Sequence, residues 1–157
     1  MKMLFRLLAA VILTVTLSSN SAKAHCEVPC GIYGDSLRIA LIAEHITTIE
    51  KSMKKITELS AMEKPNYNQL VRWVTNKEEH AAKIQHIVSQ YFLHQRIKVT
   101  DPKDAKAYKL YTLKLAKLHE LLVYSMKSKQ TTDLKYIKKL RKTLDDFSHL
   151  YFHNHIH

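Results

Sequence analysis

Apolar residues recur at alternating spacings of three and four along the chain after residue 35. This period matches the turn of an α-helix and predicts four amphipathic segments, at about 36–61, about 65–96, from 101 onward, and at about 132–152. The apolar stripes consist of Ile39, Ile42, Ile46, Ile49, Met53 and Ile56; Leu70, Val74, Ala81, Ile84, Val88 and Tyr91; Tyr108, Tyr111, Leu115, Leu118 and Leu122; and Ile137, Leu140, Leu144, Phe147 and Tyr151. We interpret these stripes as core-facing surfaces.

Capping signals mark where these helices begin. Asp35 or Ser36 is the expected N-cap of the first, and Pro65 suits the first turn of the second. Asp101 followed by Pro102 predicts the start of the third. Since the connections span roughly four to six residues, neighbouring helices are expected to run antiparallel. The fold class predicted is all-α, an antiparallel up-down four-helix bundle over 35–157.

The residues before the bundle have a different character. Gly31 and Gly34 are the only glycines, and with Pro29 they mark 25–34 as a segment of tight backbone geometry. Residues 1–24 have a basic start, an apolar stretch and small residues before position 25, which predicts a cleaved signal peptide. The apolar stretch is shorter than the ~20 residues of a spanning helix, so we expect export and no stable membrane anchor after cleavage.

Charge limits the classes of partner. The chain has 25 basic and 14 acidic side chains. Cleavage would remove Lys2, Arg6 and Lys23, which leaves 22 basic side chains and a net charge of +8. No run of Lys or Arg is dense enough for a nucleic-acid clamp, so we expect no nucleic-acid partner. The positive excess would raise the local concentration of a small anionic substrate.

Two cysteines, Cys26 and Cys30, are the only ones in the sequence. In an oxidising compartment they could form a disulfide, although so small a loop would stabilise the fold little. Cleavage before His25 would instead place an α-amine and an imidazole beside the two thiols. Two nitrogens and two sulfurs in a plane suit nickel(II) or copper(II), and these donor types alone do not choose between the two metals.

The motif His-Cys-x-x-Pro-Cys-Gly-x-Tyr, residues 25–33, resembles the nickel hook of the nickel-containing superoxide dismutases. The resemblance implies one nickel ion per subunit, bound by the amine and imidazole of His25, the amide and thiolate of Cys26 and the thiolate of Cys30. Tyr33 would lie outside the ligands of the metal, on the side from which the substrate enters. The resemblance also implies a homohexamer, and together with the leader it predicts a bacterial protein that is periplasmic or secreted.

The implied activity is conversion of superoxide to dioxygen and hydrogen peroxide by Ni(II)/Ni(III) cycling. Two alternatives remain open from the sequence. A periplasmic copper or nickel carrier could use the same hook without redox cycling, and a helical interaction protein could hold Cys26 and Cys30 as a disulfide.

The resemblance also implies that the His25 imidazole is an axial ligand supported by a group on a helix, and a metal-bound imidazole generally has such an outer partner. The candidates are Glu44 and His45 on the first helix and Glu78, Glu79 and His80 on the second. His149, His153, His155 and His157 end the chain; we interpret them as a solvated terminus, with weak nickel gathering as the alternative. The histidines interpreted as ordinary helix residues are His86, His94 and His119.

Overall fold

The computed structural model describes residues 33–152, and these residues belong to one compact unit of the chain. Four α-helices fill most of this range: α2 (Asp35–Ser60), α3 (Tyr67–His86), α4 (Ala105–Lys129) and α5 (Lys135–Phe152). A π-helix, η1 (Ile87–Arg96), continues α3 directly. No strand occurs in the described part, so the all-helical prediction is confirmed there. The predicted signal peptide, residues 25–32 of the hook and 153–157 lie outside it.

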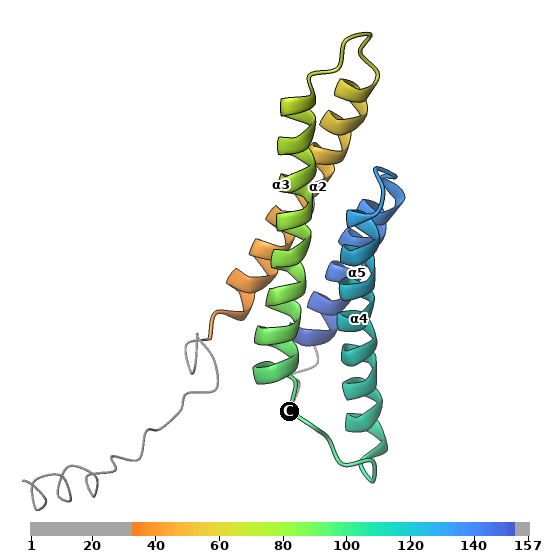
Figure 1. Ribbon diagram of the computed structural model, residues 1–157. Helices are drawn as coiled ribbons and strands as arrows, with labels where there is room; N and C mark the ends of the chain where they lie inside the picture. Colours follow the sequence, from red (N-terminus) through yellow and green to blue (C-terminus); the bar gives the residue numbers. More distant parts are fainter. Residues whose placement is uncertain (1–32, 153–157) are drawn as a thin grey trace, which may run out of the picture. The chain divides into compact units, whose positions relative to one another are not determined.

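Each of the four long helices packs against two others (Figure 1). α2 contacts α3 and α5, and α4 contacts the same two helices. This arrangement is a helical bundle in which the apolar stripes meet in one core. None of the helices in residues 33–152 is long and apolar enough to cross a membrane.

The core is built as the apolar spacing predicts, most completely on α2 and α5. On α2, Ile42, Ile46, Ile49 and Met53 are fully buried. On α5 every predicted stripe residue is buried, and Phe147 is buried completely. Burial of an aliphatic side chain of this size contributes about 1.5–3 kcal/mol, so these contacts rather than helix propensity hold the bundle together.

Two stripe predictions are wrong in part. Val74 on α3 is 40% exposed and Tyr108 on α4 is 39% exposed. Leu121, which the stripe of the third segment omitted, is fully buried. The core face of α4 therefore runs through Leu118 and Leu121, and the outer turns of α3 and α4 have apolar side chains that no neighbour within the described range covers.

The helix starts also differ from the predicted ones. α3 begins after Asn66, whose side chain accepts a 3.1 Å hydrogen bond from the Gln69 N–H, so Pro65 precedes the helix. α4 begins after Asp104, which accepts from the Ala107 N–H at 3.0 Å, so Asp101 is not the cap. In both cases an Asn or Asp nearer the apolar stripe satisfies the free N–H groups of the first turn. The last helix begins three residues later than predicted, at Lys135.

Candidate functional site

The carboxylate of Asp35 is the centre of a polar cluster at the first turn of α2. Arg96 binds it in a bidentate manner, with Nε 2.8 Å from Oδ1 and Nη2 2.7 Å from Oδ2. The hydroxyl of Tyr151 donates to Oδ2 at 2.8 Å, and the hydroxyl of Tyr91 donates to Oδ1. A single carboxylate thus joins α2, η1 and α5 two residues after the hook motif ends.

The electrostatics of this cluster keep Asp35 ionised. Burial acts to raise the pKa of the carboxyl, but the hydrogen bonds from Arg96, Tyr91 and Tyr151 outweigh it, and the net pKa lies below its usual value. The same contacts raise the pKa of Arg96. Burial and the Asp35 carboxylate raise the pKa of Tyr151 to about 12 and also raise that of Tyr91, so both phenols keep their protons at neutral pH.

Asp35 does not act as the N-cap that the sequence suggested. Gly34 occupies the N-cap position, with no side chain to bond the first turn, and Asp35 is the first helical residue. Its side chain instead binds Arg96 and the two tyrosines, and the bidentate pair with Arg96 is stronger than a hydrogen bond to a single backbone N–H. The negative charge still lies in the first turn, where the helix dipole favours it.

The π-helix explains how Tyr91 and Arg96 reach the same carboxylate. In an α-helix, residues five apart point about 140° away from each other. Bonding from residue i to i+5 brings such residues close to one face, and the Ile97 N–H bonds the Phe92 carbonyl in this way at 2.9 Å. A change in helix type therefore assembles this half of the cluster.

The cluster extends to the last residues of the hook motif. The backbone N–H of Gly34 donates to the Tyr91 hydroxyl at 2.9 Å. The guanidinium carbon of Arg96 lies 4.1 Å from the centre of the Tyr33 ring, and the Tyr33 and Tyr91 rings are 6.3 Å apart. Tyr33 is half exposed, with one face of its ring held by a cation–π contact. The chain therefore leaves the hook motif through a segment fixed to η1.

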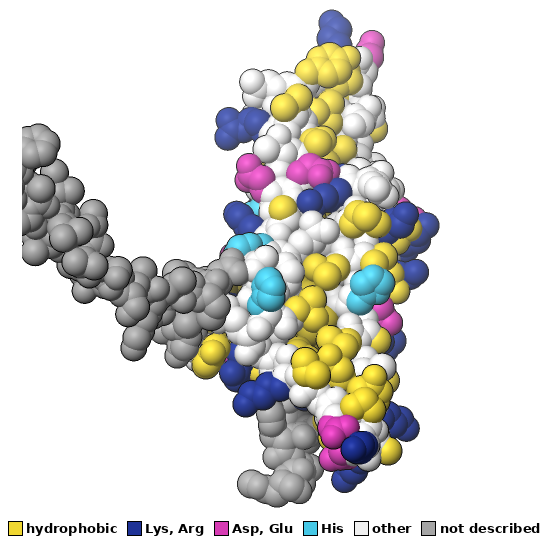
Figure 2. Space-filling view, turned by 60° about the horizontal axis from the view of Figure 1, so that its bottom comes forward, with side chains coloured by type: hydrophobic (Ala, Val, Ile, Leu, Met, Phe, Trp, Pro, Cys, Tyr) yellow, Lys and Arg dark blue, Asp and Glu magenta, His cyan; other side chains and the backbone are white. Residues whose placement is uncertain are grey.

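A second arginine adds positive charge at this end. The guanidinium carbon of Arg38 lies 5.0 Å from the centre of the Tyr91 ring. Since Asp35 neutralises one of the two arginines, the surroundings of Tyr33 and Tyr91 have a net positive charge from these groups. More widely, Lys and Arg side chains border much of the face in Figure 2, with a band of hydrophobic side chains between them.

His45 and His80, two of the candidate supporting residues, lie against each other. Their Nδ1 atoms are 3.1 Å apart, and the rings meet edge to face with centroids 4.9 Å apart. Such a contact requires one ring to donate and the other to accept. Burial is the largest cause that lowers the pKa of each ring, and the positive charge of Lys83 adds to it. Both imidazoles therefore favour the neutral form.

The carboxylates among the candidates do not join this pair by hydrogen bonds. Glu78 lies 3.7 Å from the Lys77 ammonium instead. Glu44 and Glu79 are exposed. Glu44 acts to raise the pKa of both histidines and Glu79 that of His80, but burial and Lys83 outweigh them and the net pKa of each ring is lowered. Of the five candidates, the structure brings only His45 and His80 together across two helices.

The other histidines within 33–152 form no metal site. His94 contacts the side-chain oxygen of Gln90 at 2.8 Å, and His86 and His119 are exposed on their helices. No group of three or more His, Cys, Asp and Glu side chains suited to a metal ion occurs within this range. His149 lies in the last turn of α5. His25, Cys26, Cys30 and the last three histidines of the chain are outside the described residues, and their roles stay predictions.

Sequence reasoning placed Tyr91 and Tyr151 in the core but missed their shared partner. A buried tyrosine hydroxyl usually finds a polar partner, so two tyrosines on apolar stripes were a signal that a carboxylate or carbonyl lay nearby. Arg96 had no such signal, because an arginine at the end of a helix is typical of a solvated C-terminus. Only the fold shows that Asp35 and Arg96, 61 residues apart, are paired.

Comparison with known protein families identifies the chain. The sequence profile described as nickel-containing superoxide dismutase matches residues 20–155, which include the whole hook motif and the bundle. No curated protein and no solved structure matches the chain. The match supports a nickel-dependent oxidoreductase and does not favour the metal carrier or the disulfide-linked interaction protein. The chain therefore belongs to the nickel-containing superoxide dismutases.

Proposed function

We propose that the mature protein is an exported superoxide dismutase whose nickel is held by residues 25–30 and whose hook is fixed to the bundle through Asp35. The observation that carries the proposal is the anchoring of Tyr33 and Gly34. These two residues follow the predicted ligands directly, and Arg96 and Tyr91 hold them. A fixed exit would restrict the positions that the hook can adopt, which favours a defined metal geometry.

The donor set fits nickel. His25 would supply its α-amine and imidazole, Cys26 its amide and thiolate, and Cys30 a second thiolate. Anionic sulfur and amide donors stabilise a higher oxidation state, which aqueous nickel(II) does not reach readily. When bound, nickel would supply Ni(II)/Ni(III) redox chemistry, by which two superoxide anions and two protons give dioxygen and hydrogen peroxide.

The chain's own residues would do the remaining work at this site. Arg38 would attract superoxide toward Tyr33, because Asp35 neutralises Arg96 but not Arg38, and a local positive field raises the concentration of a small anion. Tyr33 would restrict access on the substrate side, with its ring held over Arg96. For the His25 imidazole, we propose His45 and His80 as the supporting groups, because they are the only two of the named candidates that meet.

The assembly and location are part of the same proposal. We propose an up-down antiparallel order of the helices and a homo-oligomer, a hexamer by family resemblance. Tyr67, Val71 and Val74 recur at helical spacing on α3 and are 73%, 64% and 40% exposed, which supports an apolar contact between copies. Export to the periplasm or beyond follows from the predicted cleavage after residue 24, which frees the His25 amine.

The proposal is tested on mature chains that begin at His25. Cys26→Ser and Cys30→Ser should each lose nickel, measured as metal per chain, and lose superoxide decay, measured by pulse radiolysis. His119→Ala, a change of an exposed histidine on α4, is the control and should keep both. One extra residue before His25 should abolish activity, since it converts the amine into an amide. Full activity in that extended chain would refute the role of the amine.

A further inference from the structure

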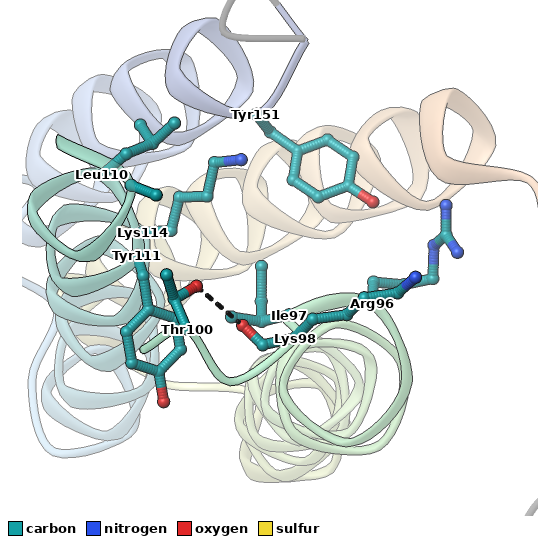
Figure 3. Close-up of a pocket in the computed structure, with 9 residues that line it drawn as sticks. Arg96, Ile97, Lys98, Thr100, Leu110, Tyr111, Lys114 and Tyr151 are labelled. Atoms are coloured by element: carbon teal, nitrogen blue, oxygen red, sulfur yellow. Dashed lines mark hydrogen bonds between the residues drawn. The ribbon is translucent and has the colours of Figure 1, made fainter. Parts of the chain in front are cut away.

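A pocket of about 370 Å³ opens beside the Asp35 cluster, and the proposed function leaves it unused (Figure 3). It lies between the end of η1, the segment that follows η1, α4 and α5. Tyr151 belongs to both sites, because it lines the pocket and its hydroxyl also binds Asp35. A ligand in the pocket would therefore touch a residue that helps to fix the hook.

The charged side chains that line this pocket are all cationic. They are Arg96, Lys98 and Lys114, and no Asp or Glu lines it. Arg96 is neutralised by Asp35, whereas no hydrogen bond or ion pair to Lys98 or Lys114 side chains exists among the described residues. The pocket thus has two positive charges that no counter-ion within residues 33–152 neutralises.

Lys114 is the more unusual of the two lysines. It is partly buried on α4, and burial lowers the pKa of its ammonium group. Its only described partner is the face of the Tyr151 ring, whose centre lies 5.3 Å from Nζ. Figure 3 shows this ammonium extending toward Tyr151 across the pocket. A desolvated cation of this kind gains more from an anionic ligand than an exposed lysine does.

The carboxylates of the nearby loop are engaged elsewhere. Asp101 accepts a hydrogen bond from the Lys103 N–H at 2.9 Å, and Asp104 caps α4 through the Ala107 N–H. Neither forms an ion pair with Lys98 or Lys114. The loop therefore leaves the positive charge of the pocket available.

The remaining walls are largely apolar. Ile97, Leu110 and the rings of Tyr111 and Tyr151 form them. An inorganic anion would leave these walls without contact, and a neutral hydrocarbon would leave the Lys114 cation unpaired. The walls and the charge together fit a ligand that has one anionic group and a flat apolar body.

We propose that this pocket binds small aromatic monocarboxylates, with the carboxylate on Lys114 and the ring between Leu110 and the two tyrosines. Lys98, which is exposed at the rim, adds long-range attraction. The binding does not depend on nickel, so it is distinct from the dismutase reaction.

Calorimetric titration of benzoate into the mature nickel-loaded protein tests the proposal. Lys114→Gln should weaken binding about tenfold, since a charge-assisted contact is lost. Lys98→Gln should weaken it about twofold to threefold, which corresponds to an exposed charge. Lys109→Gln removes an equal charge from an exposed position of α4 outside the pocket and should leave binding unchanged.

Two further ligands separate the parts of the claim. Benzyl alcohol, which has the ring without the charge, and inorganic phosphate, which has charge without the ring, should each bind at least tenfold more weakly than benzoate. The Cys26→Ser chain should bind benzoate as well as the unchanged protein does, whatever its superoxide activity. Equal binding of phosphate and benzoate, or an equal loss of benzoate affinity in the Lys114 and Lys109 variants, would overturn the proposal. If the Lys114 variant fails to fold, an unchanged benzoate affinity in the Lys98 variant would overturn it.

Discussion

Replacing Asp35 by asparagine tests the cluster that fixes the end of the hook. The change keeps the size of the side chain but removes its charge, so Arg96 loses its counter-ion and Tyr91 and Tyr151 lose a charged acceptor. The amide NH₂ of the new side chain is a hydrogen-bond donor, and it would face the donor groups of Arg96 and the tyrosine hydroxyls.

The magnitude follows from burial and bonding. Breaking a fully buried ion pair costs about 3–5 kcal/mol, and a hydrogen bond to a charged group contributes about 1.5–3 kcal/mol. The Asp35 and Arg96 side chains are 17% and 25% exposed, so solvent screens part of the interaction. We expect Asp35→Asn to lower the free energy of unfolding by about 2–3 kcal/mol.

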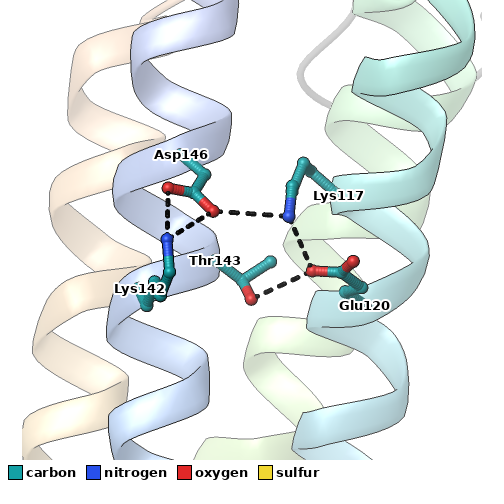
Figure 4. A network of polar contacts seen from close by, with 5 residues as sticks. All are labelled: Lys117, Glu120, Lys142, Thr143 and Asp146. Atoms are coloured by element: carbon teal, nitrogen blue, oxygen red, sulfur yellow. Dashed lines mark hydrogen bonds and ion pairs between the residues drawn. The ribbon is translucent and has the colours of Figure 1, made fainter.

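Urea unfolding of the metal-free mature chain, followed by circular dichroism, measures this loss as a lower midpoint at unchanged slope. Asp146→Asn is the matched control. Asp146 bonds Lys142 at 3.0 Å and Lys117 at 3.3 Å (Figure 4). Asp146 is 30% exposed, against 17% for Asp35, and its partner Lys142 is 77% exposed, so the control should lose less than about 1 kcal/mol. Equal losses in the two variants would refute the special role of Asp35.

The pH dependence gives an independent check on the same residue. The folded pKa of Asp35 lies below its unfolded value, so the unfolded chain binds the proton more readily. The stabilisation by this group is therefore complete above the unfolded pKa of about 4 and is lost as pH falls through the folded pKa. The difference in free energy of unfolding between the unchanged chain and Asp35→Asn should be constant from pH 6 to 8, because this range lies about two units or more above the unfolded pKa. The difference should shrink below pH ~4.

Three further outcomes follow from other contacts of the bundle. His45 and His80 should titrate below pH ~6.5 by NMR, because burial lowers the pKa of both rings. Since the two histidines bind protons more readily in the unfolded chain, the free energy of unfolding should fall as pH drops below ~6.5. Titration of both rings at or above pH ~6.5 would contradict their burial. His80→Phe should raise the pKa of His45 in the same spectra, because it removes a repelling neighbour, and an unchanged value would exclude coupling between the rings. Lys77→Met should lower the free energy of unfolding by about 1–3 kcal/mol, because the buried ammonium binds the carbonyls of Lys129 and Thr131 near the end of α4. The control Lys83→Met changes an exposed lysine of α3 and should lower it by less than about 0.5 kcal/mol.

The fold was predictable where the apolar pattern is regular. On α5 the spacing of Ile137, Leu140, Leu144, Phe147 and Tyr151 identified every stripe residue as buried, and the structure confirms it. Such positions follow from helix geometry alone, because one face must be removed from water.

Helix ends were less predictable because several residues competed for each cap. Asp101 and Asp104 both suit an N-cap, and only packing of the apolar stripe decides for Asp104. The outer turns were uncertain for a similar reason: Val74 fits the period but lies beyond the neighbours that would cover it. The sequence of one helix does not show where a neighbouring helix packs, so it does not show which of its apolar side chains that neighbour covers.

For the site, a contiguous motif predicts the ligands His25, Cys26 and Cys30, and these residues lie outside the part of the chain that the structure describes. The Asp35 cluster joins residues from α2, η1 and α5, and two of its members depend on a π-helix that no sequence pattern signalled. The sequence offered five candidates for the support of His25, and in the fold only His45 and His80 of these five contact each other. Long-range pairing of polar groups requires the tertiary structure.

The most direct test of the account uses natively exported protein. N-terminal sequencing, metal content and superoxide decay are measured on one sample. We expect a chain that begins at His25, contains about one nickel ion per subunit and accelerates superoxide decay, with all activity lost in Cys26→Ser. A nickel-loaded chain beginning at His25 that does not accelerate superoxide decay would contradict it.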